Sequence, residues 1–233
     1  MEKLIHPKSL LSVCIAAYND ENTMERIIRE STQTLQELKL DFEIMAVNDC
    51  SSDNTGKILD SLQKTFKHLR VVNHQQNKGY GITIKELLYN SRGDIIFTLP
   101  GDLQIPPQEI KKMLPWINEY DIVIGARRPR NDPLSRKINS AIYNQMVNLL
   151  YCIGTSDVNS SKLIKRSVMD KIKLVSDGPF VDAELCAKAV RNNFKIKDIR
   201  IEHKQRLFGS PSGDKPAVMW KAFKETVSML GKI

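Results

Sequence analysis

The chain has 233 residues, of which 41% are hydrophobic, and a formal net charge of +8. This length fits one large domain or one domain with an appendage, and no apolar run reaches the roughly 18 residues of a membrane-spanning helix. The positive charge favours anionic partners. Because the basic residues are spread out, with only a mild cluster at 127–130 and no recognition helix, we expect no nucleic-acid partner.

The N-terminus and the cysteines favour a cytosolic protein. Residues 1–7 include no long apolar region, so we expect no signal peptide. Each cysteine falls in or beside an apolar stretch, and the four lack metal-ligand spacing. We therefore expect buried free thiols in a reducing compartment; the four are Cys14, Cys50, Cys152 and Cys186.

Strand and helix patterns alternate through the first half of the chain. Short apolar runs predict strands, and apolar residues three or four apart predict helices between them. The strands are expected at 10–17, 42–47, 69–72, 94–99 and 121–124. This alternation predicts βαβ units in an α/β fold with a mainly parallel sheet flanked by helices. Right-handed crossovers would then gather the loops at the strand ends on one edge.

A carboxylate and an amide follow the apolar run 95–99. Asp102 and Gln104 come next, and the double proline 106–107 then ends the strand. The carboxyl ends of parallel strands border the crevice in which open α/β sheets bind ligands. In a locally extended backbone both side chains would point the same way and would suit Mg²⁺ or Mn²⁺, and hence a diphosphate. The alternative is that Asp102 caps the next helix.

The pattern changes after Gly125. A polar loop at 129–133 precedes a helix predicted over 134–153. Arg136 and Ser140 are four residues apart and share one side of this helix, either as a solvated face or as part of a site. The apolar stripe roughly opposite consists of Ile138, Ile142, Met146, Leu149 and Ile153.

Four further segments complete the chain. Asp182 and Glu184 precede another helix, 196–201 is a late strand, and 206–212 is a loop. The tail 216–230 has apolar residues on one side and could lie on a bilayer or dock on its own domain.

The strand-end residues form an ordered series of motifs. It comprises residues 12–20, ending in Tyr18-Asn19-Asp20; residues 47–55, around Asp49; Asn77-Lys78-Gly79-Tyr80-Gly81; Ser91-Arg92-Gly93-Asp94; Gly125-Ala126-Arg127; and Arg206 with Gly209. In order and spacing this series resembles the inverting glycosyltransferases of family 2, which have the GT-A fold. The likeness is closest to the branch with dolichol-phosphate mannosyltransferase and polyprenyl-phosphate glycosyltransferases.

The resemblance implies a domain organisation. A GT-A domain would span residues 1–213, with a nucleotide-sugar half at about 8–126 and an acceptor half at about 127–213. Residues 214–233 would be an amphipathic tail. The enzyme would lie on the cytoplasmic face of a membrane, bound to its surface or to a membrane partner protein.

The resemblance also implies roles. Asp49 would accept a hydrogen bond from the base of a UDP- or GDP-sugar, and Tyr18 would pack on that base. Asp102 and Gln104 would hold Mg²⁺ or Mn²⁺ at the donor diphosphate. The catalytic residues would be Asp102, Arg127 and Arg136. Ala16, Asp20, Lys78 and Gly79 would complete the nucleotide site, and a lipid-phosphate acceptor would be bound by Arg127, Arg136, Ser140 and Arg206.

Departures from the family pattern keep alternatives open. Pro100 stands where the family has the first Asp of Asp-x-Asp, which raises the possibility of a catalytically weak nucleotide-sugar-binding subunit. Another alternative is transfer to a sugar hydroxyl in surface-polysaccharide assembly, which would need a general base. The candidates for that base are Asp182 and Asp157, although Asp157 can equally brace its turn and Asp182 cap its helix.

Overall fold

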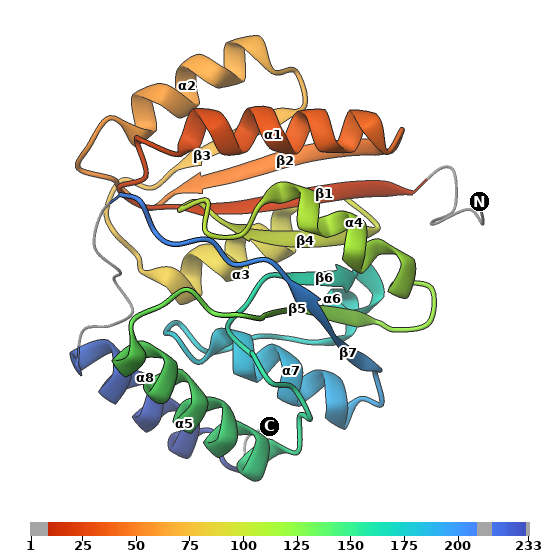
Figure 1. Cartoon of the computed structure of the whole chain (residues 1–233), viewed down its shortest axis with the longest axis vertical. Coiled ribbons are helices and arrows are strands. Elements are labelled where there is room, and N and C mark those ends of the chain that lie inside the picture. Colours follow the sequence, from red (N-terminus) through yellow and green to blue (C-terminus); the bar gives the residue numbers. More distant parts are fainter. Residues whose placement is uncertain (1–8, 209–215, 232–233) are drawn as a thin grey trace.

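The computed structural model of the chain describes residues 9–208 and 216–231, which form a seven-stranded sheet covered by helices on both faces (Figure 1). The strand order is β3-β2-β1-β4-β6-β5-β7, and every pairing is parallel except those of β6. The strands are β1 (Leu10–Ala17), β2 (Asp41–Asn48), β3 (Leu69–Asn73), β4 (Ile95–Pro100), β5 (Ile122–Arg127), β6 (Lys162–Lys165) and β7 (Ile196–Ile201). The predicted α/β fold with a mainly parallel sheet is confirmed.

Helices cover the sheet because its strands bury side chains on both faces. Val13 and Ile15 of β1 join one apolar core with α1, α2 and α4, while Cys14 between them joins the other core with α3, α5, α6 and α7. This alternation follows from the two-residue period of a strand. The helices are α1 (Met24–Glu37), α2 (Thr55–Thr65), α3 (Tyr80–Asn90), α4 (Ile110–Met113), α5 (Leu134–Tyr151), α6 (Arg166–Lys171), α7 (Val181–Arg191) and α8 (Pro216–Ser228), with short 3₁₀ turns at Pro107–Glu109 and Leu114–Trp116.

Strand β6 was not predicted. It has four residues and runs antiparallel between β4 and β5. Its Lys-Leu-Ile-Lys sequence is too short to show a period, so only its partners identify it as a strand.

Helix α5 differs from its prediction in two ways. It ends at Tyr151, because Cys152 adopts a left-handed conformation with φ 54°. Most of its predicted apolar stripe faces outward, with Ile142 61% and Leu149 81% exposed, but Ile153 lies beyond the helix and is buried, as is the polar Asn144 within it. The wheel therefore grouped Ile138, Ile142 and Leu149 correctly and Ile153 wrongly, and hydrophobicity alone does not tell which face meets the protein.

The cysteine prediction holds for half of the set. Cys14 and Cys186 are buried, but Cys50 and Cys152 are exposed, and all four are free thiols. Cys50 and Cys152 lie at left-handed positions just after β2 and α5, where the chain turns away from the core.

Some predicted features lie outside the described residues. The loop predicted over 206–212 is described only as far as Phe208, and the predicted boundary at 213/214 and residues 1–7 are not described. Within the ranges that are described, no helix combines the length and apolar character that crossing a bilayer requires.

Candidate active site

The loops that follow β1 and β4 meet at one edge of the sheet. Ala16 pairs with Pro100, and Gly101 N donates to Ala16 O over 3.2 Å. A Cβ on Gly101 would lie 2.6 Å from Asp20 Oδ2, so the absence of a side chain there allows the two loops to approach. The other parallel strands end at the same edge, and the predicted residues Tyr18, Asp20, Asp49, Asp102 and Arg127 all lie at or just beyond strand ends there.

Asp49 is held rigidly at the end of β2. Its carboxylate accepts hydrogen bonds from the backbone N–H groups of Lys78 (2.7 Å) and Gly79 (2.9 Å) and contacts His74 Nδ1 at 2.7 Å. Gly79 has φ 86°, a left-handed conformation that glycine adopts without strain, and this turn aims both amides at the carboxylate. The other nitrogen of His74 contacts Glu86 at 2.8 Å. The buried His74 therefore fixes the orientation of Asp49.

Asp102 and Asp20 share one cation, Arg206. The guanidinium of Arg206 lies 3.1 Å from Asp102 Oδ2 and 3.8 Å from Asp20 Oδ1. Burial, reinforced by the charge of Asp102, raises the pKa of Asp20 to about 6. A cavity of about 210 Å³ adjoins these groups, lined by Asn19, Asp20, Asn22, Thr23, Asp53, Asp102 and Phe208.

Gln104 does not point the same way as Asp102. Leu103 between them has φ 56°, so the extended backbone assumed for this segment is wrong. Gln104 is buried, and its side-chain amide donates to Lys204 O over 3.3 Å. Because Pro100 offers no side-chain ligand, Asp102 is the carboxylate that this loop offers to a cation.

These groups fit a metal ion shared with a substrate better than an all-protein metal cage. In the described part of the chain, no three His, Cys, Asp or Glu residues are arranged to hold a metal. Mg²⁺ commonly binds through one or two carboxylates together with substrate phosphates. Asp102, with Asp20 beside it, meets that minimum requirement.

Arg127, at the end of β5, is locked onto Asp157. Its side chain donates to both carboxylate oxygens, at 2.8 and 2.7 Å, and its backbone N–H donates as well at 3.1 Å. Burial lowers the pKa of Arg127, but the hydrogen bonds and charge of Asp157 outweigh it and raise the pKa overall. In turn, Arg127 holds the pKa of Asp157 below its usual value despite burial. Both carboxylate oxygens of Asp157 are thus engaged by Arg127.

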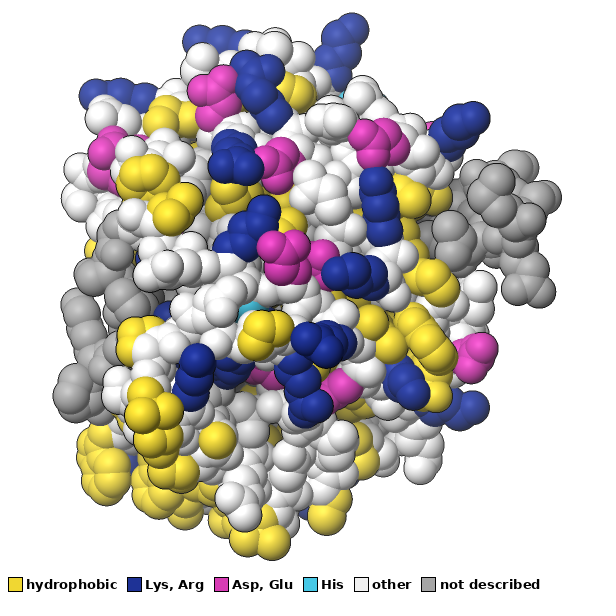
Figure 2. Space-filling model, viewed as in Figure 1, with side chains coloured by type: hydrophobic (Ala, Val, Ile, Leu, Met, Phe, Trp, Pro, Cys, Tyr) yellow, Lys and Arg dark blue, Asp and Glu magenta, His cyan; other side chains and the backbone are white. Residues whose placement is uncertain are grey.

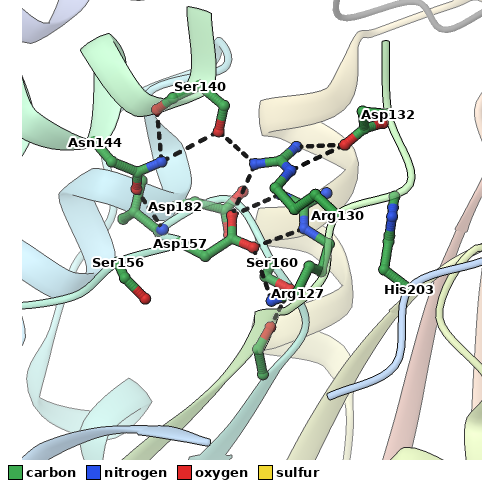
Figure 3. A network of polar contacts seen from close by, with 12 residues as sticks. Arg127, Arg130, Asp132, Ser140, Asn144, Ser156, Asp157, Ser160, Asp182 and His203 are labelled. Atoms are coloured by element: carbon green, nitrogen blue, oxygen red, sulfur yellow. Dashed lines mark hydrogen bonds and ion pairs between the residues drawn. The ribbon is translucent and has the colours of Figure 1, made fainter. Parts of the chain in front are cut away.

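Arg130 extends this group toward α5 (Figure 3), and Arg136 of α5 joins it through Asp132. Arg130 pairs with Asp132 at 2.9 Å, donates to Ser140 Oγ, and lies 3.5 Å from Asp157. Arg136 pairs with the other oxygen of Asp132 at 3.0 Å. Arg127, Arg130 and Arg136 therefore surround two carboxylates and leave a formal surplus of one positive charge, and we call this group the arginine cluster.

His203, just beyond β7, contacts the loop that carries Arg130. Its Nδ1 accepts a hydrogen bond from Asn131 N at 3.0 Å, whereas its buried Nε2 has no hydrogen-bond partner among the described residues. Burial, together with the charge of Arg127, lowers the pKa of His203 to about 4, and Asp102 opposes this shift. His203 is therefore neutral at pH 7.

Asp182 is engaged in a buried network of its own. It pairs with Lys162 Nζ at 2.6 Å and accepts a hydrogen bond from Tyr80 OH at 2.7 Å. The side chains of Lys162 and Asp182 are 1% and 7% exposed. Tyr80 is 48% exposed overall, but its hydroxyl is desolvated at Asp182, and this desolvation together with the charge of Asp182 raises its pKa well above the ordinary value, so the hydroxyl stays protonated.

The structure arranges the predicted residues in neighbouring groups. Asp49, Lys78 and Gly79 form one, Asp20, Asp102 and Arg206 a second, and Arg127, Arg136 and Ser140 a third. The residues that sequence reasoning missed are His74, Arg130, Asp132, Lys162 and His203. Two signals could have found some of them: His74 and His203 each lie two residues after the end of a predicted strand, and Arg130 lies in the basic cluster at 127–130.

Comparison with known proteins identifies relatives in sequence and in fold. The family model described as glycosyl transferase family 2 matches residues 12–173. A solved structure of glucosyl-3-phosphoglycerate synthase from Mycobacterium tuberculosis, in complex with Mn²⁺, UDP and glucosyl-3-phosphoglycerate, superposes with a TM-score of 0.74 at 16% identity, covering 96% of this chain and 81% of that one.

Further solved structures have the same fold. The same synthase with Mn²⁺ and UDP-glucose gives a TM-score of 0.75 at 17% identity, covering 96% of this chain and 80% of that chain. A mycobacterial protein gives 0.75 at 16% identity, with 96% and 76% covered. At these identities the likeness establishes the shared fold, which agrees with the GT-A architecture expected from the motifs.

Proposed function

This chain belongs to glycosyl transferase family 2, and we propose that it transfers a sugar from a UDP- or GDP-sugar to a polyprenyl or dolichyl phosphate in a metal-dependent, inverting reaction. The observation that carries the acceptor assignment is the arginine cluster, which holds Arg127, Arg130 and Arg136 in place at the strand edge. Guanidinium groups bind phosphate oxygens bidentately, which suits a phosphate better than a neutral acceptor.

The donor site is assigned to the groups around Asp49. Its carboxylate, oriented by His74 and two backbone amides, is placed to accept a hydrogen bond from the N–H of a uracil or guanine base. Tyr18 is 44% exposed at the same edge and offers a ring on which a base can pack. Ala16 and Asp20 lie where β1 ends, toward the diphosphate side of the site.

Asp102 is assigned to the metal. The related fold of glucosyl-3-phosphoglycerate synthase was solved with Mn²⁺ and UDP-glucose, which supports a divalent ion at the donor diphosphate here. A bound Mg²⁺ or Mn²⁺ would offset the negative charge that grows on the leaving nucleoside diphosphate. Gln104 could join only after its amide leaves Lys204 O.

The acceptor phosphate needs no general base. It is ionised near neutral pH, since a phosphomonoester has its second pKa at about 6. One of its oxygens attacks the anomeric carbon, the bond from that carbon to the diphosphate oxygen breaks, and the nucleoside diphosphate leaves with the electron pair. Arg127, Arg130 and Arg136 would hold the phosphate for this attack, with Ser140 and Arg206 beside them.

A second candidate acceptor is a hydroxyl on a phosphorylated molecule. It is favoured by the fold neighbour that was solved with glucosyl-3-phosphoglycerate. This reaction would need a carboxylate to remove the proton, but Asp182 is held by Lys162 and Tyr80, and Asp157 by Arg127. The phosphate acceptor is therefore the better supported of the two.

The proposal is tested by offering UDP- and GDP-sugars with Mn²⁺ or Mg²⁺ to three acceptors. These are a short-chain polyprenyl phosphate, 3-phosphoglycerate and a sugar hydroxyl. Metal-dependent glycosylation of the polyprenyl phosphate alone is the expected result. Transfer only to 3-phosphoglycerate or to the sugar would contradict the lipid-phosphate assignment, and the absence of both transfer and donor hydrolysis would contradict the catalytic one.

A further inference from the structure

Helix α8 is docked on the domain by one narrow side. Ala222, Thr226 and Met229 are buried, and Tyr151 OH of α5 donates to Thr226 O over 2.5 Å. Glu225 accepts hydrogen bonds from Ser176 Oγ at 3.2 Å and from the backbone of the same segment. These contacts fix the rotation of α8 and therefore determine which of its side chains face away from the protein.

The outward side of α8 is apolar. Trp220, Phe223, Val227 and Leu230 follow helical spacing and are between 43% and 59% exposed, and Met219 beside them is 37% exposed. The buried side of α8 explains why the helix is docked in this orientation. Nothing among the described residues covers its exposed apolar stripe. In an aqueous setting such a row of large side chains is unfavourable.

Helix α5 continues the same surface. Asn139 Nδ2 lies 3.7 Å from Met219 Sδ, and the two helices run side by side (Figure 1). The space-filling view shows hydrophobic side chains gathered over this corner of the molecule (Figure 2). We call this surface the α5–α8 face, and its exposed members are Leu134, Ile138, Ile142, Leu149, Met219, Trp220, Phe223, Val227 and Leu230. Monomeric proteins rarely expose a contiguous apolar surface of this kind unless it binds something.

The charges around the α5–α8 face are basic. The sequence of α5 has no Asp or Glu, and the only carboxylate of α8 is Glu225, which is hydrogen-bonded into the domain. Lys137, Lys221 and Lys224 are exposed on these helices. An apolar stripe bordered by lysines complements a bilayer with anionic headgroups, since the lysines meet the headgroups while the apolar side chains enter the acyl boundary.

The aromatic pair on α8 has the chemistry of an interfacial anchor. Trp220 and Phe223 stack at 5.5 Å with an interplanar angle of 9°, and Lys224 Nζ lies 5.4 Å from the centre of the Trp220 ring. Tryptophan is enriched at membrane–water interfaces because its ring is apolar and its N–H is polar. Together with the flanking lysines and the absence of unpaired carboxylates on α5 and α8, this pair suits an anionic headgroup layer.

We infer that the α5–α8 face docks the enzyme on an anionic lipid bilayer. This inference deepens the proposed function and rests on it in one respect, namely that the acceptor is held in the same bilayer. Arg136 and Ser140 lie on the side of α5 that carries the arginine cluster, and the apolar residues of α5 lie on its other side. Docking would therefore hold the phosphate-binding groups about one helix diameter, roughly 10 Å, from the apolar layer, next to the headgroup region.

The test is co-sedimentation of the full chain with phosphatidylcholine vesicles that do or do not contain phosphatidylglycerol. Wild type should bind the anionic vesicles. Phe223→Ser with Leu149→Ser, both at exposed positions, should weaken binding at least about tenfold. Lys221→Glu with Lys224→Glu should weaken it at least about 30-fold. The matched control, Lys64→Glu with Lys67→Glu at the end of α2, has the same net charge and should bind within about twofold of wild type if docking is confined to the face.

A fluorescence measurement identifies the docked side. The chain has two tryptophans, so Trp116→Phe leaves Trp220 as the reporter, and its emission should shift to shorter wavelength on anionic vesicles. No shift, no binding by wild type, or equal losses in the α2 control would overturn the inference. So would dimerisation that Phe223→Ser with Leu149→Ser abolishes, because a second copy would then cover the face.

The vesicle assay and the acceptor assay can fail separately. Vesicle binding contains no acceptor and no donor, and transfer to a water-soluble, short-chain polyprenyl phosphate requires no vesicle. Vesicle binding without sugar transfer would support the docking face and contradict the lipid-phosphate acceptor. Sugar transfer without vesicle binding would support the lipid-phosphate acceptor and contradict the docking face.

Discussion

The guanidinium of Arg206 donates a hydrogen bond to the carboxylate of Asp102 over 3.1 Å, although the two residues are 104 positions apart in the chain. Asp20 lies 3.8 Å from the same guanidinium. A cation of the protein thus stands where Asp102 would meet a divalent ion. We expect metal and donor to displace Arg206 from Asp102 and leave it available to the acceptor phosphate.

Arg206→Ala should therefore tighten binding of Mn²⁺ alone while it slows sugar transfer. The gain should be about fivefold, because an ion pair of this exposure contributes about 1 kcal/mol. Isothermal titration with Mn²⁺ checks the first effect and product formation the second. Lys204→Ala is the matched control. It removes a neighbouring positive charge that forms no ion pair with Asp102 among the described contacts. Weaker Mn²⁺ binding in Arg206→Ala would show that the arginine does not compete with metal.

Asp102→Asn should remove metal-dependent donor binding and lower turnover at least about a hundredfold, because a catalytic metal contributes several kcal/mol. Thermal shift with a nucleotide sugar and Mn²⁺ reports the binding. Gln104→Ala should lose much less, since its amide is turned to Lys204 O. The exposed Asp170→Asn serves as control. Unchanged Mn²⁺-dependent stabilisation of Asp102→Asn would remove this residue from the metal site.

Two further variants distinguish a phosphate acceptor from a hydroxyl acceptor. Arg136→Ala should raise the KM for the acceptor phosphate and lower kcat/KM well over tenfold, because a charge-assisted contact to phosphate is lost. Asp182→Asn keeps hydrogen-bonding capacity toward Lys162 and Tyr80 and should stay within about tenfold of wild type. A loss beyond about a thousandfold in Asp182→Asn, with donor binding intact, would indicate a general base and hence a hydroxyl acceptor.

Lys162→Met should destabilise the fold by about 3–5 kcal/mol, because it leaves the buried Asp182 without its counter-charge. Urea denaturation gives the change in the free energy of unfolding. Lys165→Met is the control, since its ion pair with Asp121 is partly exposed and should contribute less than about 1 kcal/mol. Equal effects of the two substitutions would mean that the buried pair has no special role.

His203 should make stability depend on pH. Its folded-state pKa is about 4, below the ordinary 6.5, so the unfolded chain binds the proton more readily. Its contribution is therefore fully present above pH 6.5 and is lost as the pH falls toward 4, on the order of 3 kcal/mol in total. Denaturation curves between these values should show a shallower pH dependence for His203→Gln and an unchanged one for the exposed His68→Gln.

The strand-end motifs could be placed from the sequence because their signals are local. A strand period followed by a turn-forming polar residue positions Asp49 or Asp102 without knowledge of any partner. Crossover handedness then brings these loops to one edge. The same reasoning could not find Asp132, whose role arises from pairing with Arg130 and Arg136 across a loop.

Conformation within a motif was also beyond the sequence. The left-handed backbone at Leu103 separates Gln104 from Asp102, and nothing in the residue type of Leu predicts it. The prediction of which side of α5 is buried was wrong for a different reason. Hydrophobic side chains normally indicate the core, so the sequence favoured burial where the fold instead buries Asn144, which accepts a hydrogen bond from Val158 N at 2.8 Å.

The antiparallel β6 gathers most of the proposed acceptor site into one segment of the chain. Because β6 runs against its neighbours, the chain leaves β5 and re-enters the sheet at the same edge, so residues 127–162 form one excursion that carries Arg127, Arg130, Arg136, Ser140 and Asp157. The donor groups at Asp49 and Asp102 precede this excursion. If the acceptor binds as proposed, exchange of this segment between family members would change most of the acceptor contacts, Arg206 excepted, while the nucleotide-sugar half stays intact, which offers one route by which acceptors could diversify on a constant fold.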